Sequence, residues 1–192
     1  MHKNERDPLA QKPEAWRMYA IGLRRSAELI WEQWHSLFSK LGVKPTSFTS
    51  QEADDLILLL PSFLLLSGLS LENLLKGVLI AIEPPRQEGR LDWEIPRGGH
   101  DLPTLCERAG IAISTDELRM LNALTEAVLW AGRYPVPIRH DNRREWPIPL
   151  GMELAGMTPD NLAEHFTNYK HSFDSLFSRI CELYPQQGCY ER

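Results

Sequence analysis

The sequence lacks the short motifs that identify the common enzyme classes. It contains no glycine-rich phosphate loop, no Gly-x-Ser-x-Gly nucleophile motif and no His-Glu-x-x-His zinc motif. Its three cysteines form no Cys-x-x-Cys pair, and its six histidines include no pair four residues apart. These absences argue against a disulfide framework and against a zinc site, so we expect neither a metal nor a cofactor.

Positive charge is also scarce. The formal net charge of -5 argues against a general nucleic-acid coat, because such proteins need a clustered positive surface to neutralise phosphates. A local basic patch is still compatible with this net charge.

The N-terminal residues MHKNERDPLAQKPEAW carry no apolar segment behind their charges, so no signal peptide is predicted. Together with the unpaired cysteines, this predicts a reducing, cytoplasmic location.

Only one apolar run is long enough to raise the question of a membrane, and it covers residues 56–66. Pro61 interrupts the run, and Ser67, Glu72 and Lys76 follow within the length of one membrane span. We therefore predict a buried core helix and no membrane association.

Helical periodicity dominates the rest of the chain. Apolar residues recur every three or four positions in four segments, which predict long helices at about 13–41, 51–82, 115–131 and 158–184. Ser50 and Ser114 have the form of N-caps, Asp101 should cap a short helix closed by Gly110, and Pro61 should kink or break the second long helix. No segment has the alternating pattern that predicts a strand. We expect an all-α fold, an antiparallel helical bundle of four major helices plus one short helix.

We expect the chain to form a single domain over residues 1–192, with flexible ends at 1–12 and 186–192. Its centre should lie on the second half of the second long helix. The residues expected to be buried there are Leu71, Leu74, Leu75, Val78, Leu79 and Ile82, with Tyr19 on the apolar face of the first long helix and Leu118, Leu121, Thr125 and Val128 on the third. Glu72 and Lys76 lie one turn apart beside this face and form either a solvated ion pair or a buried pair that fixes bundle register.

Residues 133–157 contain four prolines and cannot form a regular helix. A connection of this length inside a domain is usually functional or disordered. It gathers the main basic cluster of an acidic chain, with two aromatic rings as stacking platforms: Arg133, Tyr134, Arg139, His140, Arg143, Arg144 and Trp146. This segment is a candidate RNA or phosphate contact, and His with Arg would suit metal-independent RNA cleavage. The alternative is a solvated loop whose arginines pair with acidic helices.

Three segments in a fixed order resemble the HEPN family of small helical-bundle proteins. They are LSLENLLKGVLI, GHDLPTLCERAG and a helix that ends in WAGRYPVP. The matching positions are Ser70-Leu71-Glu72 with Lys76-Gly77, then His100-Asp101-Leu102, then Arg133-Tyr134-Pro135. Many members of that family are dimeric ribonucleases of toxin–antitoxin, phage-defence or RNA-processing systems, with an Arg-x(4–6)-His motif.

The resemblance implies a role for each of these positions. Arg133 and His140, with six residues between them, would be the catalytic pair of an endoribonuclease acting as a homodimer. The residues implied in RNA or nucleotide binding are Arg139, Arg143, Arg144, Tyr134, His100 and Lys76. Pro135 and Pro137 depart from the family pattern, which places its motif at the start of a helix. A second function therefore stays open, that of a non-catalytic module that binds a companion protein resembling an antitoxin.

Overall fold

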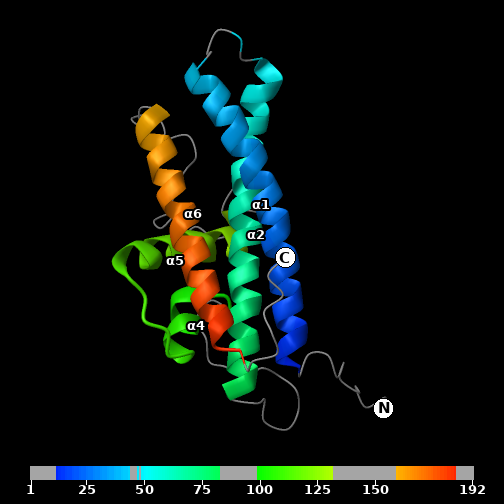
Figure 1. Cartoon of the computed structure of the whole chain (residues 1–192), viewed down its shortest axis with the longest axis vertical. Coiled ribbons are helices and arrows are strands. Elements are labelled where there is room, and N and C mark those ends of the chain that lie inside the picture. The colour runs from blue at the N-terminus through cyan, green and yellow to red at the C-terminus, as the bar shows by residue number, and fades with distance from the viewer. Residues whose placement is uncertain (1–11, 44–46, 48, 83–98, 132–158, 185–192) are drawn as a thin grey trace.

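The computed structural model describes residues 12–43, 47, 49–82, 99–131 and 159–184. In chain order these residues form α1 (Pro13–Val43), α2 (Ser50–Ile82), the short α4 (Leu102–Arg108), α5 (Thr115–Glu126), the π-helical turn η3 (Ala127–Ala131) and α6 (Pro159–Glu182) (Figure 1). None of the described residues forms a strand. The predicted all-α class is confirmed, and the four long helices and the short one have the predicted positions to within a few residues, except that η3 replaces the last turn of α5.

The first two helices pack side by side in opposite directions (Figure 1). Ser70 Oγ donates a 2.8 Å hydrogen bond to the carbonyl of Ala20, and Trp34 Nε1 donates a 3.1 Å bond to the carbonyl of Leu56. Residues early in α1 therefore face residues late in α2. These bonds satisfy buried polar groups at two levels of the hairpin and so fix its register.

The last helix, α6, closes the bundle against both members of this hairpin. Phe166 packs edge-on against Trp34 with ring centroids 5.2 Å apart, and Tyr184 donates a 2.7 Å hydrogen bond to the carbonyl of Leu74. The hydroxyl reaches this carbonyl because residue 77 is glycine: a Cβ at Gly77 would lie 2.0 Å from the tyrosine oxygen. Burial in this contact raises the pKa of Tyr184 above its usual value.

Helix α5 runs across α2 and is extended by η3 (Figure 1). Gly68 makes this crossing close, since a Cβ there would lie 2.6 Å from Val128 Cγ2 and 2.9 Å from the carbonyl oxygen of Leu124. Glu117 on α5 is buried and accepts a 2.8 Å hydrogen bond from Arg179 on α6. Gly68 thus lets α5 and η3 pack closely against the second half of α2, as Gly77 does for Tyr184.

Two of the three predicted helix caps are confirmed and one was wrong. Ser114 and Glu117 form a reciprocal capping box, and Asp101 caps α4 as predicted. The cap of α2 is Thr49 rather than Ser50, which is the first residue of the helix. Thr49 N–H donates to Glu52 Oε2 at 2.9 Å, and Glu52 N–H donates back to Thr49 Oγ1 at 3.2 Å. The sequence Thr-Ser-Gln-Glu already had the capping-box spacing, which the prediction overlooked.

The predicted centre of the core is confirmed for Leu71, Leu74, Leu75, Val78 and Leu79, which are all buried. Three other expectations were wrong: Tyr19, Ile82 and Leu118 are exposed. Tyr19 is one position from Ala20, which faces the core, so its side chain points about 100° away from that face. Leu118 has the same relation to buried Glu117, and Ile82 ends its helix. Of the two alternatives predicted at Pro61, a kink or a break, the break is excluded because α2 continues through this residue.

Candidate functional site

Two charged residues of α2 lie in the most buried part of the molecule. Glu72 and Lys76 are one helical turn apart, and Lys76 Nζ donates a 2.6 Å hydrogen bond to Glu72 Oε1. Only 8% of the glutamate side chain and 13% of the lysine side chain are exposed. The expectation of a solvated ion pair is therefore wrong and the alternative of a buried pair is confirmed. Charges buried to this extent need partners, because desolvation costs more than an isolated charge recovers.

The second oxygen of the same carboxylate has a partner from a different element. His100 Nδ1 lies 2.9 Å from Glu72 Oε2, and 36% of the histidine side chain is exposed. An ionised carboxylate only accepts hydrogen bonds, so Nδ1 carries the hydrogen and donates it. Glu72 therefore holds Lys76 with one oxygen and His100 with the other. We call Glu72, Lys76 and His100 the carboxylate clamp.

The residues around His100 explain how it reaches α2. Gly99 has φ = +91°, a backbone conformation that favours glycine. Asp101 Oδ1 accepts a 3.0 Å bond from Thr104 N–H, and the N–H of buried Leu102 donates a 3.1 Å bond to Thr125 Oγ1 on α5. Each residue of the His-Asp-Leu segment thus has a separate role: the histidine reaches α2, the aspartate caps α4 and the leucine enters the core.

The structure brings together two of the eight predicted site residues, Lys76 and His100. The other six lie outside the described residues: Arg133, Tyr134, Arg139, His140, Arg143 and Arg144. Glu72 was not predicted as a site residue, although it makes both contacts of the clamp. Its spacing of four from Lys76 was visible in the sequence, but nothing local connected it with His100.

The π-helical turn η3 is the last described element before Arg133. Val128 of this turn packs against Gly68, and Thr125, just before the turn, holds Leu102. Such π segments are rare and occur often at functional sites, because the widened turn redirects the chain that follows. Here the segment connects the part of α5 beside the His-Asp-Leu segment to the arginine-rich residues.

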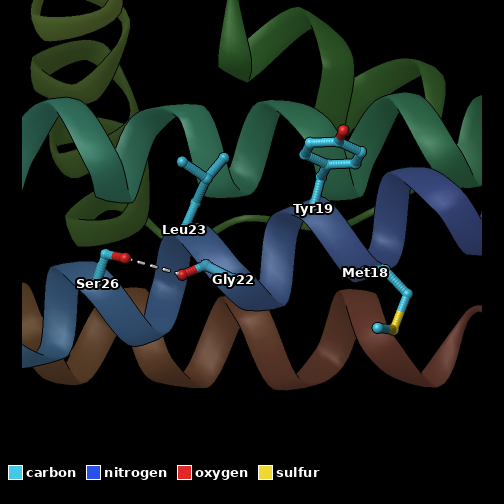
Figure 2. Close-up of a pocket in the computed structure, with 5 residues that line it drawn as sticks. All are labelled: Met18, Tyr19, Gly22, Leu23 and Ser26. Atoms are coloured by element: carbon cyan, nitrogen blue, oxygen red, sulfur yellow. Dashed lines mark hydrogen bonds between the residues drawn. The ribbon is translucent and has the colours of Figure 1, made fainter.

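A second surface feature lies on α1. A shallow groove of about 360 Å³ is lined by Met18, Tyr19, Gly22, Leu23 and Ser26. Figure 2 shows these residues along one side of the helix, with Ser26 Oγ bonded to the carbonyl of Gly22 at 3.2 Å. Met18, Tyr19 and Leu29, which lies about three turns further along α1, are all more than two-thirds exposed. Large apolar side chains grouped on one exposed face commonly mark a contact surface for protein.

Three further properties of the described residues bear on the kind of site. No three side chains of His, Cys, Asp or Glu gather there in a way that could hold a metal ion. By length and composition α2 could also cross a membrane, a test that core helices of soluble proteins pass as well. Cys106 is buried, and this burial raises the pKa of its thiol to about 12, which makes it unreactive near neutral pH.

Comparison with known protein families, with curated proteins and with solved structures gives no match for this chain. The resemblance to the HEPN family therefore stays a prediction from the sequence.

Proposed function

We propose that the protein binds RNA or nucleotides as a HEPN-like helical bundle, and that the carboxylate clamp is part of the binding site. The observation that supports this most directly is the Glu72 carboxylate, which holds Lys76 and His100 together although they come from different elements. A half-exposed imidazole beside an ammonium group suits the phosphate and sugar groups of RNA.

The arginine-rich segment extends this proposal. Arg133 follows η3 after a single residue, so the basic residues continue the chain from the helix that packs beside the His-Asp-Leu segment. In this proposal Arg139, Arg143, Arg144 and Tyr134 bind phosphates and bases. Arg133 and His140 form the catalytic pair of a metal-independent endoribonuclease of the toxin–antitoxin or phage-defence kind, the histidine taking the proton of the 2′-hydroxyl and the arginine stabilising the phosphate charge.

Equilibrium binding of a fluorescent single-stranded RNA, measured by anisotropy over a series of salt concentrations, tests the proposal. Lys76→Ala should weaken binding and reduce the slope of log K against log salt by about one unit if the lysine contacts one phosphate. Lys170→Ala is the matched control, because Lys170 pairs with Asp174 at the same i,i+4 spacing and is similarly buried on another helix. Failure of the wild-type protein to bind RNA or nucleotides at low salt would contradict the proposal.

The catalytic assignment has a separate test. His140→Ala should abolish cleavage of RNA in a gel assay that contains a metal chelator and no added metal. The melting curve of the protein should stay unchanged. If this variant still cleaves RNA, His140 is not the catalytic histidine, and the proposal of RNA binding is unaffected.

The exposed face of α1 supports a second candidate function, that of a protein-interaction module. Met18, Tyr19 and Leu29 offer an apolar surface on either side of the small residues Gly22 and Ser26. We propose that a second copy of the chain covers this face, since a two-fold axis near residue 24 would place Met18 of each copy against Leu29 of the other. Such a homodimer is compatible with RNA binding, whereas a companion protein on the same face defines the non-catalytic alternative.

Light scattering from micromolar to near-millimolar protein distinguishes these cases. Wild-type protein should approach twice the monomer mass, and Tyr19→Lys should return it to the monomer mass. Ser39→Lys, which adds the same charge at an exposed position elsewhere on α1, should leave the dimer intact. A monomer at every concentration excludes the homodimer.

A further inference from the structure

The carboxylate clamp determines which atoms of its two outer groups face a ligand. Because His100 donates its Nδ1 hydrogen to Glu72, the neutral ring has an unprotonated Nε2 that accepts hydrogen bonds. Nε2 lies on the edge of the ring away from the carboxylate. More than a third of the His100 side chain is exposed, whereas Glu72 itself is almost fully buried. In the neutral ring, the polar atom of the histidine that is left for a ligand is therefore an acceptor.

Lys76, beside the histidine, offers hydrogen-bond donors instead of an acceptor. Its ammonium group has three donor hydrogens, and its bond to Glu72 Oε1 uses one of them. The two oxygens of one carboxylate are neighbours, so the lysine and the histidine that bind them are held next to each other. The pairing also restricts both side chains before any ligand arrives, which reduces the entropy lost on binding.

The ligand that matches this arrangement must offer a hydrogen-bond donor next to an anionic acceptor. In RNA the 2′-hydroxyl and the adjacent 3′-phosphate supply this combination at every nucleotide, and DNA lacks the hydroxyl. We infer that His100 Nε2 accepts a hydrogen bond from a ribose 2′-hydroxyl while Lys76 contacts the neighbouring phosphate, so that the clamp selects RNA over DNA. This inference rests on the proposed function, since it specifies which chemical groups the RNA-binding site recognises.

Glu72 acts in this scheme as a positioning residue. It does not touch the ligand, but it fixes the ring tautomer and the separation between the two contacts. A glutamine at this position keeps the shape and loses the charge, and its amide would present a donor where the carboxylate has an acceptor. Glu72→Gln should therefore reduce the preference for RNA, whereas a purely structural role for Glu72 would leave this preference unchanged.

Three oligonucleotides of one sequence test the inference on the wild-type protein: RNA, DNA and 2′-O-methyl RNA, each single-stranded with the same 5′ dye. The protein should bind RNA about tenfold more tightly than DNA, a difference within reach of one well-placed hydrogen bond. The 2′-O-methyl RNA should bind as weakly as DNA, because its ribose oxygen no longer donates. Equal affinity for RNA and DNA would overturn the inference and leave the proposed function intact.

The variants separate the two contacts. His100→Ala should lower RNA affinity to the level of DNA and leave DNA affinity unchanged, whereas Lys76→Ala should weaken both by the same factor. His171→Ala, which removes an exposed histidine on α6, is the control for His100→Ala. Equal weakening of RNA and DNA by His100→Ala would contradict a contact to the 2′-hydroxyl. A wild-type protein that binds none of the three would remove the proposed function as well.

Discussion

The two halves of α2 differ in how their composition relates to their burial: the more apolar half is the more exposed, and the half that carries charges is the more buried. The first half, residues 56–66, is the most apolar stretch of the sequence, yet Ile57 and Leu58 are exposed, the latter at 66%. The second half contains Glu72 and Lys76, yet Leu71, Leu74, Leu75 and Leu79 are fully buried there and both charges are nearly so. The more polar half is the better buried.

The difference follows from what packs against each half. The second half is approached closely at its small residues: by α5 and η3 at Gly68, and by Trp16 of α1 and Tyr184, just after α6, at Gly77. The charged residues enter this region because the clamp gives each of them a partner. Hydropathy alone therefore does not locate the core of this protein. Its candidate site is distinguished by buried charged side chains that all have partners.

Two leucine truncations test this comparison with the largest expected effect. Leu75→Ala should lower the free energy of unfolding by about 2–5 kcal/mol, because it leaves a cavity in the packed half. Leu58→Ala should change it by less than about 0.5 kcal/mol, because its side chain is largely exposed. Urea denaturation of both variants measures the contrast. Similar losses from the two would show that the first half of α2 is covered as completely as the second.

The close approach at Gly77 predicts a loss of intermediate size. Gly77→Ala should cost about 1–3 kcal/mol, because its methyl group would overlap the Tyr184 hydroxyl and lie 2.9 Å from Trp16 Cβ. The cost should be smaller in a Tyr184→Phe background, where the hydroxyl is absent. Gly22→Ala is the control, since nothing lies within 4 Å and alanine should stabilise α1 by up to about 1 kcal/mol. Equal costs of Gly77→Ala in the two backgrounds would argue against the contact.

A smaller effect is expected from the clamp itself. Glu72→Gln should lower the free energy of unfolding by roughly 1–2 kcal/mol, in the lower part of the range for a buried group that loses its partner, because His100 keeps access to water. Arg119→Ala removes an ion pair with Asp116 in which both side chains are more than three-quarters exposed, so it should have almost no effect. Thermal unfolding compares the two, and a larger loss from Arg119 would reverse the argument.

The smallest effect concerns the start of α2. The Lys40 ammonium and the Thr49 backbone N–H hold the pKa of Glu52 down from 4.5 to about 2. A lowered pKa in the folded state means that the ionised cap stabilises the protein above pH 4.5, and that this contribution is lost as the pH falls from there to about 2. Glu52→Gln should remove that part of the acid dependence in a pH series of melting temperatures. An unchanged pH profile would show that the cap does not contribute.

The sequence predicted most of the fold because its helices carry strong periodicity and local caps. Four helix ranges, the capping box at Ser114 and the buried leucines of the second half of α2 all depend on neighbours in sequence. The three failed burial predictions share one cause, which is that burial depends on distant neighbours: Tyr19 and Leu118 lie just beside a buried position, and Ile82 ends its helix.

The candidate site was predictable only in part. Lys76 and His100 were named from the resemblance to a family, but their connection through Glu72 spans separate elements and appears only in three dimensions. The burial of Thr125 was predicted, but its hydrogen bond to Leu102, which helps to place His100, carries no sequence signal. The predicted catalytic pair, Arg133 and His140, lies outside the described residues and stays a prediction.

Nuclear magnetic resonance of protein labelled with ¹⁵N at its histidines tests the central claim most directly, because it observes the ring nitrogens of His100 while RNA is added. The free protein should show His100 as the tautomer protonated at Nδ1, and its Nε2 resonance should shift and saturate with RNA while that of His171 stays in place. The resonance of His100 should stay in place when DNA of the same sequence is added at equal concentration. A His100 resonance that does not respond to bound RNA would contradict a functional role for the carboxylate clamp.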